Sequence, residues 1–238
     1  MALEILNVDC MKYMKGLPDN AFDLAIVDPP YGLGEAGKRS GTRTSKGGSQ
    51  KFWGTKNTRG TEIKSTVFAD KDWDNEPPPA EYFEELRRVS KNQIIWGANH
   101  FSDRINMPSS CWIVWDKLNG TSNFADCELA YTSFKTAVRQ YQFKWSGMLQ
   151  GDMKNKEVRI HPTQKPVKLY EWLLQHYAKK DDRILDTHLG SGSHAIAAHY
   201  GGFDFVGCEL DKDYYEALKN RIQTETRQIS LLDDTNAA

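Results

Sequence analysis

The stretch that decides the fold is "RILDTHLGSGSHAIAAHYGGFDFVGCE", residues 183–209. An apolar strand ends at Asp186, a glycine-rich turn follows, a helix begins behind the turn, and a second strand ends at Glu209. Glycine lets the backbone approach a ligand closely, and the start of the helix adds free N–H donors. Glu209, 17 residues after Gly192, is placed to accept hydrogen bonds from a ribose diol. The unit therefore predicts a site for a nucleoside-containing cofactor.

Two other interpretations of this unit are open. A tight glycine turn followed by a surface glutamate would bind no ligand. NAD would be the usual expectation, because residues 190–195 fit the pattern GxGxxA. Dinucleotide-binding folds normally carry this pattern at their first strand, however, and here it lies near the end of the chain.

The rest of the chain alternates between short apolar strands and amphipathic helices. We expect strands at residues 3–8, 22–27, 93–96, 112–115, 128–134, 183–185 and 203–208, and helices at residues 11–16, 79–89, 166–177, 194–200 and 213–224. This alternation predicts a single doubly wound α/β domain over residues 1–238. Residues 34–66 are rich in Gly, Ser, Thr, Lys and Arg, and we expect them to form an inserted mobile loop.

The composition is that of an ordinary globular protein. Hydrophobic residues make up 39% and charged residues 26% of the 238 positions, which is enough to bury a substantial core. No apolar run approaches the roughly 20 residues of a membrane span, and no secretory signal is visible, so no membrane association is expected. The four cysteines are far apart, which favours a reducing cytoplasm, and no histidine has zinc-like spacing with them, so no metal site is expected.

Positive charge is concentrated in two segments. Residues 35–64 and residues 135–168 each contain eight basic and two acidic side chains, a net charge of +6 for each segment, although the whole chain carries −1. Aromatic residues are interleaved with these charges. The pattern favours a nucleic-acid partner over two exposed, merely solubilising loops, because stacking and phosphate contacts then act together.

A second motif, "VDPPYG" at residues 27–32, ends another apolar strand. Two consecutive prolines fix φ and offer no N–H donor. The carboxylate of Asp28 and the carbonyl of Pro29 therefore stay directed as two hydrogen-bond acceptors. A polar turn capped with prolines is the alternative explanation.

Asp28-Pro29-Pro30-Tyr31, together with "LDTHLGSGS" (185–193) and "HPTQKP" (161–166), resembles the S-adenosylmethionine-dependent DNA amino-methyltransferases, which modify adenine N6 or cytosine N4. The motif order, catalytic first and cofactor last, is similar to the circularly permuted β group of that family. The resemblance spans residues 9 to about 221. It implies a mostly parallel, seven-stranded Rossmann-like methyltransferase sheet with one antiparallel strand. It also implies S-adenosyl-L-methionine as cofactor, double-stranded DNA as substrate and a bacterial or phage-encoded cytoplasmic protein, with a homodimer suggested by analogy.

The chemistry of the first motif agrees with this resemblance. An exocyclic amine on an aromatic ring is a poor nucleophile, because its lone pair is delocalised into the ring. Two acceptors that bind its two protons would free the lone pair, and a tyrosine ring would stack on a base flipped out of its helix. We therefore expect the catalytic residues to be Asp28, Pro29, Pro30 and Tyr31. An aspartate at position 28 favours adenine, since the cytosine N4 enzymes more often carry serine there.

The resemblance also implies a set of cofactor contacts. The predicted residues are Asp9, Cys10, Asp28, His161, Pro162, Thr163, Lys165, Asp186, Thr187, His188, Gly190, Ser191, Gly192, Ser193, Glu209 and Leu210. Asp9 and Thr163 could instead, or also, be helix N-caps. The family usually has Asp-Pro-Phe where this chain has Asp186-Thr187-His188, which leaves open what packs on the cofactor at His188.

DNA would lie across the edge of the sheet where the two motifs meet. We expect residues 135–160 to form the target-recognition region and residues 34–66 to order on DNA. The predicted DNA-binding residues are Lys38, Arg39, Arg43, Lys51, Arg139, Lys144, Lys154 and Arg159. The leading hypothesis is a site-specific adenine N6 methyltransferase. Its rivals are a cytosine N4 enzyme, an RNA or protein amide methyltransferase, and a DNA-binding protein that keeps the fold without turnover.

Overall fold

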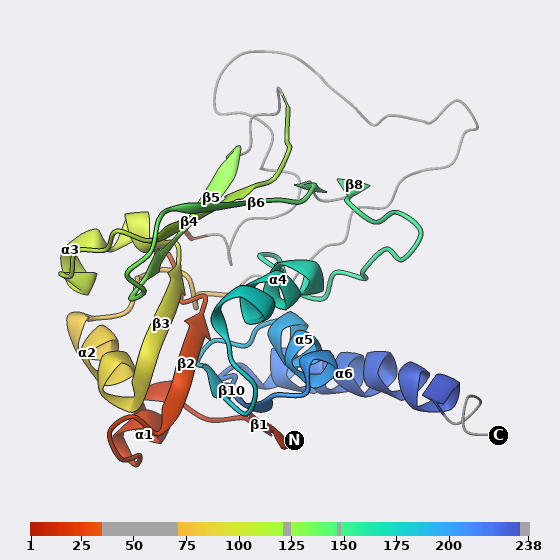
Figure 1. The fold of residues 1–238 in the computed structure, drawn as a ribbon. Helices are drawn as coiled ribbons and strands as arrows, with labels where there is room; N and C mark the ends of the chain where they lie inside the picture. Colours follow the sequence, from red (N-terminus) through yellow and green to blue (C-terminus); the bar gives the residue numbers. More distant parts are fainter. Residues whose placement is uncertain (35–70, 121–124, 147–148, 234–238) are drawn as a thin grey trace.

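A mixed eight-stranded sheet lies at the centre of the part of the chain that the computed structural model describes, residues 1–34, 71–120, 125–146 and 149–233 (Figure 1). The strand order is β1-β10-β9-β2-β3-β5-β4-β6. The strands are β1 (Leu3–Leu6), β2 (Phe22–Val27), β3 (Ser90–Trp96), β4 (Trp112–Asp116), β5 (Cys127–Thr132), β6 (Arg139–Gln142), β9 (Arg183–Asp186) and β10 (Asp204–Cys208). A separate two-stranded ribbon pairs β7 (Trp145–Ser146) with β8 (Leu149–Gln150).

The sheet is mostly parallel, as predicted, and β5 runs antiparallel to both of its neighbours. It has eight strands where seven were expected. The additional strand, β6, is a four-residue edge strand of sequence RQYQ that is largely exposed. Three of its four residues are polar, so the strand shows no hydrophobic alternation by which the sequence could reveal it.

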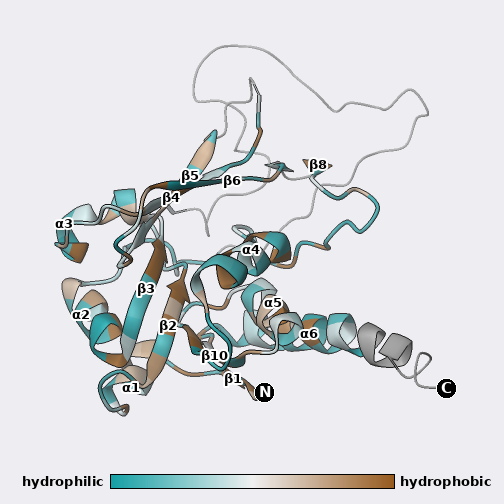
Figure 2. Cartoon of the chain, in the orientation of Figure 1, coloured by the Kyte–Doolittle hydropathy of each residue, from teal (hydrophilic) through white to brown (hydrophobic). Residues whose placement is uncertain are grey.

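Alternate residues of β2 enter two separate hydrophobic cores. Leu24 and Ile26 point into one core, and Ala25 and Val27 point into the other. Successive side chains of a strand point to opposite faces, so a strand buried on both faces reads as a continuous apolar run. In Figure 2 the strand is coloured as hydrophobic, whereas the helix α2 (Ala80–Val89) combines hydrophilic and hydrophobic residues.

Helices cover both faces of the sheet, which confirms the doubly wound α/β prediction (Figure 1). The core that contains Ala25 receives buried residues from four helices: α1 (Cys10–Lys15), α2, the short η2 (Ala98–His100) and α3 (Ser102–Ile105). The helices α4 (Val167–Tyr177), α5 (Ser193–Gly201) and α6 (Lys212–Asp233) contribute to the core that contains Leu24. None of the described helices is long and apolar enough to cross a membrane.

The chain reverses its winding between β2 and β9, which are adjacent parallel strands. From β2 the chain passes through α2 to β3, and from β9 it passes through α5 to β10 on the other side. The two connections leave in opposite directions, so a crevice opens at the carboxyl ends of these strands. Both sequence motifs begin there, at Asp28 after β2 and at Asp186 on the last position of β9.

Candidate active site

A cavity of about 550 Å³ lies at this crevice. It is lined by the corner after β2, by the glycine turn after β9, by the end of β10 and by the segment before α4. The predicted residues that line it are Asp9, Cys10, Asp28, Pro30, His161, Thr163, Lys165, Thr187, His188, Gly190, Ser191, Glu209 and Leu210. The two motifs, about 160 positions apart in the sequence, therefore meet around one cavity.

The glycine turn is fastened to the carboxylate of Glu209. The backbone N–H of Gly190 donates to Oε2 of Glu209 at 2.8 Å, and the N–H of Asp211 donates to Oε1 at 2.8 Å. Gly190 has φ +54°, a conformation that favours glycine. Burial raises the pKa of Glu209 to about 7. Each carboxylate oxygen accepts one of these bonds and has a second lone pair that neither N–H uses.

Asp186 supports the same turn from behind. Its carboxylate is buried, lies 3.0 Å from Nδ1 of His194 and accepts a hydrogen bond from the backbone N–H of His188. The helix α5 begins at Ser193 after Gly192, which has φ +78°. Asp186, Gly192 and Ser193 are not among the residues that line the cavity. Their position indicates that they shape the turn.

His188, where the family usually has an aromatic residue, forms part of the cavity wall. Its Nδ1 lies 2.9 Å from the Thr187 hydroxyl, and its ring packs edge-on against Tyr82 with centroids 5.3 Å apart. The Tyr82 hydroxyl in turn lies 2.6 Å from the Thr187 hydroxyl. Burial lowers the pKa of His188 to about 4. The imidazole that lines the cavity at this position is therefore neutral at pH 7.

A second aromatic wall is built from Trp73, His161 and Tyr214. The His161 ring lies 5.0 Å from Trp73 and 4.4 Å from Tyr214, centroid to centroid. Burial, reinforced by Lys165 and Arg159, lowers the pKa of His161 to about 3. Thr163, which could have been a helix N-cap, does not cap α4, because Pro166 is the cap residue. Its hydroxyl instead lies 3.1 Å from Nδ1 of His161.

The Asp28 corner is held by Asp74. One oxygen of this buried carboxylate accepts hydrogen bonds from the backbone N–H of Tyr31 at 2.7 Å and of Gly32 at 3.0 Å. Gly32 has φ +73°, and a Cβ there would lie 2.6 Å from Pro77. The Tyr31 ring stacks on His100 at 5.0 Å, and a Cβ at Gly97 would clash with it. The corner is therefore fixed by packing as well as by its prolines.

A buried cluster of charges surrounds the Asp28 carboxylate. The ammonium group of Lys165 lies 2.5 Å from Oδ2, and the Tyr31 hydroxyl donates to Oδ1 at 2.6 Å. Lys165 also pairs with Glu128 at 3.0 Å, and Glu128 pairs with Lys117. Burial alone would raise the pKa of Glu128, but Lys165 and Lys117 lower it to about 2. The cluster contains two acids and two lysines and is electrically neutral.

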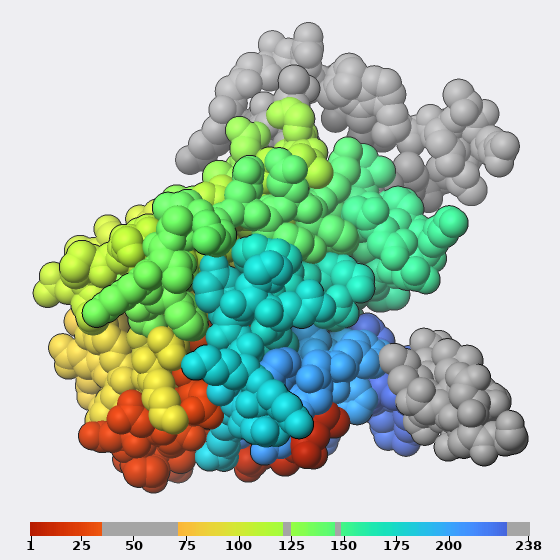
Figure 3. Space-filling view, viewed as in Figure 1, coloured from red at the N-terminus to blue at the C-terminus, as the bar shows by residue number. Residues whose placement is uncertain are grey.

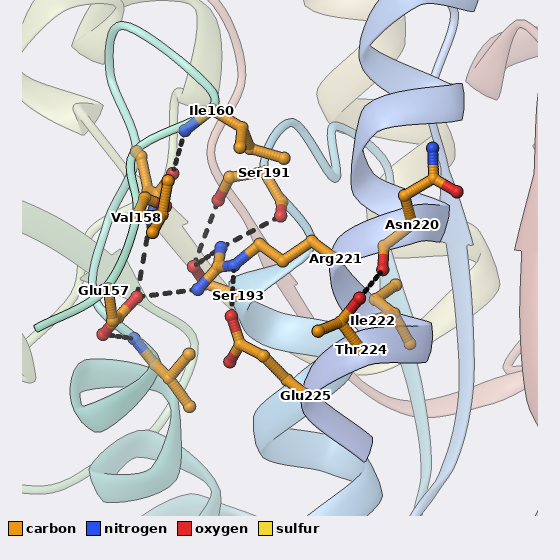
Figure 4. Close-up of polar contacts among 12 residues, drawn as sticks. Glu157, Val158, Ile160, Ser191, Ser193, Asn220, Arg221, Ile222, Thr224 and Glu225 are labelled. Atoms are coloured by element: carbon orange, nitrogen blue, oxygen red, sulfur yellow. Dashed lines mark hydrogen bonds and ion pairs between the residues drawn. The ribbon is translucent and has the colours of Figure 1, made fainter. Parts of the chain in front are cut away.

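Arg221 of α6 connects the glycine turn to the segment before α4 (Figure 4). Its guanidinium donates to the Ser191 carbonyl at 3.0 Å and to the Ser193 hydroxyl at 2.9 Å. It also pairs with Glu157 at 2.8 Å and with Glu225 at 2.7 Å. The Glu157 carboxylate accepts a further bond from the N–H of Val167, the first residue of α4. Arg221 thus ties three segments of the chain together.

The remaining predicted residues lie at or near the cavity. Asp9 is both the N-cap of α1, accepting from the N–H of Lys12 at 3.0 Å, and a residue of the cavity wall. Pro29, Tyr31 and Pro162 are not among the lining residues. Within the described residues, no group of His, Cys, Asp and Glu has the arrangement of a metal site.

The predicted DNA-binding residues fall into three groups. Arg139 and Lys154 are exposed, and Lys144 is half-buried. Arg159 is half-buried and its guanidinium donates to the carbonyl of Pro162. Lys38, Arg39, Arg43 and Lys51 lie outside the described residues, as does the expected loop 34–66 apart from its first residue.

Sequence reasoning missed several residues that shape this site, chiefly Glu128, Lys117, Asp74, Trp73 and Arg221. Lys117 follows an apolar strand, as Asp28 does, so a search for polar residues at strand ends could have found it. Glu128 reaches the same rim because β5 runs antiparallel, which only the fold reveals. Asp74, Trp73 and Arg221 belong to none of the sequence motifs, so no pattern pointed to them.

The chain resembles known proteins both in sequence and in fold. Residues 122–220 match the family described as DNA methylase. The chain is 25% identical to the Type II methyltransferase M.HpaI of Haemophilus parainfluenzae, over 98% of this chain and 78% of that protein. Its fold is similar to that of the M1.HpyAVI–SAM complex, with a TM-score of 0.53, 18% identity and coverage of 92% of this chain and 98% of that one. It is also similar to that of the PvuII cytosine-N4-specific DNA methyltransferase, with a TM-score of 0.55 and 10% identity. This match covers 94% of this chain and 91% of that one.

The sequence matches cover the "HPTQKP" segment and the glycine turn, and the relative M.HpaI covers nearly the whole chain. The two solved structures are similar in overall fold along most of their length. The chain is therefore similar, in sequence and in fold, to DNA amino-methyltransferases.

Proposed function

We propose that this protein transfers a methyl group from S-adenosyl-L-methionine to the N6 amino group of adenine in double-stranded DNA, after the base has flipped out of the helix. One observation carries the proposal: Asp28 and the Gly190–Glu209 pair line the same cavity of about 550 Å³. Small-molecule sites usually measure about 300–1,000 Å³. The cavity is therefore large enough to hold a cofactor beside a reacting group.

The walls of the cavity fit a nucleoside cofactor. Glu209 offers two carboxylate oxygens at the position expected for a ribose diol. Trp73 and the neutral rings of His161 and His188 offer flat, weakly polar surfaces. When bound, S-adenosyl-L-methionine supplies an electrophilic methyl group on a sulfonium centre. The crystal structure of M1.HpyAVI, which has a similar fold, is a SAM complex.

Asp28 and the carbonyl of Pro29 would accept hydrogen bonds from the two protons of the target amine. Each oxygen of Asp28 already accepts one bond, from Tyr31 or Lys165, and each retains a lone pair for the amine. With both protons bound, the lone pair on nitrogen would be free to attack the methyl carbon; the N–C bond would form as the C–S bond breaks, and sulfur would keep that electron pair as a neutral thioether. The nitrogen would then lose one proton, which the Asp28 carboxylate would accept.

The choice of adenine rests on the aspartate at position 28, and cytosine N4 is the alternative product. The test is to incubate the protein with labelled S-adenosyl-L-methionine and unmethylated duplex DNA and to analyse the nucleosides. N6-methyladenine is the expected product. N4-methylcytosine would show that the target base is wrong, and no transfer to DNA or RNA would overturn the proposal.

Replacing Asp28 by alanine should leave cofactor affinity nearly unchanged and remove most turnover. A hydrogen bond to a charged group contributes roughly 1.5–3 kcal/mol, which corresponds to about a 10- to 100-fold loss of kcat, and lost geometry should add to it. Asp103→Ala, which removes an exposed acid on α3, is the matched control and should keep normal kcat. Near-normal kcat in Asp28→Ala would remove this carboxylate from the reaction.

A further inference from the structure

We infer that Lys165 is a positioning residue, whose ammonium group fixes the orientation of the Asp28 carboxylate and maintains it as an anion facing the target amine. This role differs from the cofactor contact that the sequence motif suggested. The inference rests on the proposed function, because it makes Lys165 the partner of Asp28, the carboxylate that would accept a hydrogen bond from the target amine.

The geometry leaves Lys165 no N–H for another partner. An ammonium group has three donors, and the Lys165 nitrogen has three oxygen neighbours: Asp28 Oδ2 at 2.5 Å, Glu128 Oε2 at 3.0 Å and the Tyr31 hydroxyl at 3.1 Å. Its side chain is 3% exposed. Glu128 is itself paired with Lys117, so Lys165 is the lysine that compensates Asp28. A buried carboxylate that loses such a partner becomes costly in its charged form.

The groups that face Asp28 come from four parts of the fold. Lys165 lies on the segment before α4, Tyr31 on the same corner, Glu128 on β5 and Tyr170 on α4. Burial and the charge of Glu128 raise the pKa of Asp28, and Lys165 opposes both effects. The pKa of Tyr31 is raised well above its ordinary value by burial and by Asp28, so its hydroxyl stays a donor. Removing the charge of Lys165 should therefore raise the pKa of Asp28 further.

A protonated Asp28 is a poorer acceptor, so activity should fall on the acid side as Asp28 takes up a proton. Lys165→Met should move this acid limb of kcat to higher pH by about one unit or more, which is a tenfold change in proton concentration. Lys165→Gln, a neutral donor, should move it equally and serves if the methionine variant does not fold. Lys165→Arg keeps the charge and should leave the limb near its wild-type position, even if kcat falls.

The control is Lys91→Met. Lys91 lies on β3 and pairs with Asp23, which lies near the start of β2, whereas Asp28 follows the end of that strand. This variant should not move the acid limb. A second measurement needs neither cofactor nor turnover: titration of the side-chain carboxyl of Asp28 by ¹³C NMR, with the signal assigned through Asp28→Asn. The pKa of Asp28 should be higher in the methionine and glutamine variants than in the wild type.

An unchanged acid limb and an unchanged carboxyl titration in both neutral variants would overturn the inference, even if kcat or KM changes. Failure of the proposed function looks different. In that case the wild type transfers no methyl group to adenine, while the NMR titration still measures the effect of Lys165 on Asp28.

Discussion

Glu209 should make cofactor binding depend on pH near neutrality. Its pKa is raised to about 7 by burial, and only the carboxylate form offers acceptors on both oxygens to a ribose diol. As pH falls below 7 the carboxyl becomes protonated, so the affinity for S-adenosyl-L-methionine should fall by roughly tenfold for each pH unit. Calorimetric measurement of Kd between pH 5.5 and 8.5 checks this. His161 and His188, with pKa values of about 3 and about 4, remain neutral throughout that range.

Glu209→Gln is the control for this titration, because glutamine keeps the shape of the side chain and does not ionise. Its cofactor affinity should be weaker than that of the wild type at pH 8 and nearly constant across the range. A wild-type Kd that does not change between pH 6 and pH 8 would contradict the assignment of Glu209 to the cofactor.

At the scale of single residues, the sequence could predict those positions at which a motif coincides with the end of a strand. Asp28 and Glu209 are of this kind, and both line the cavity. For Lys165 the motif indicated the cofactor, whereas the structure places its ammonium group on Asp28. A motif records which residues occur together, but the partner of a long, flexible side chain depends on which strands become neighbours.

At the scale of secondary-structure elements, Arg221 should control the position of the glycine turn. Its side chain is 6% exposed and bonds the turn at Ser191 and Ser193 (Figure 4). Arg221→Leu leaves the carboxylate of Glu157 without its cation, which typically costs about 3–5 kcal/mol of unfolding free energy. We expect this loss in chemical denaturation, together with a weaker cofactor affinity and a smaller change in kcat.

Two further variants separate this contact from a general effect of losing a charge. Arg227→Leu removes an exposed arginine from the same helix and should change stability by less than about 0.5 kcal/mol. Adding Glu157→Gln to Arg221→Leu should recover part of the lost stability, since no unpaired carboxylate remains. Additive losses in the double variant would show that the two residues do not act as a pair.

Which elements the sequence could predict depended on their length and their burial. The helix α2 shows buried residues at helical spacing (Tyr82, Phe83, Leu86 and Val89), and the predicted helix agrees with it to within one residue. The strands β6, β7 and β8 are four, two and two residues long and carry little apolar periodicity. They form because β4 and their own chain neighbours offer backbone partners, a cause that a local pattern does not contain.

At the scale of the whole molecule, the segment from β5 to β8 adjoins the cavity wall, since Glu128 of β5 pairs with Lys165 and the indole N–H of Trp145 donates to the carbonyl of Gln164. Figure 3 shows this segment, green to teal, as a continuous band above α4. The exposed Arg139 and Lys154 belong to it, while Lys180 is exposed in the loop that leads into β9 at the opposite end of the strands. The sequence predicted a basic recognition region at residues 135–160, and its contact with DNA stays a prediction.

That contact can be tested through the salt dependence of DNA binding. Each neutralised phosphate contributes about 0.9 to the slope of log K against log salt concentration. Arg139→Glu and Lys154→Glu should each weaken DNA binding and lower the magnitude of this slope by about 1, measured by fluorescence anisotropy between 50 and 250 mM salt. Lys180→Glu makes the same change in net charge at the opposite edge and should leave the slope unaltered. If all three variants lose the same amount of affinity, only the net charge matters and DNA does not lie across the β5–β8 segment. If Arg139→Glu and Lys154→Glu lose affinity and Lys180→Glu does not, the result supports a recognition region at residues 135–160.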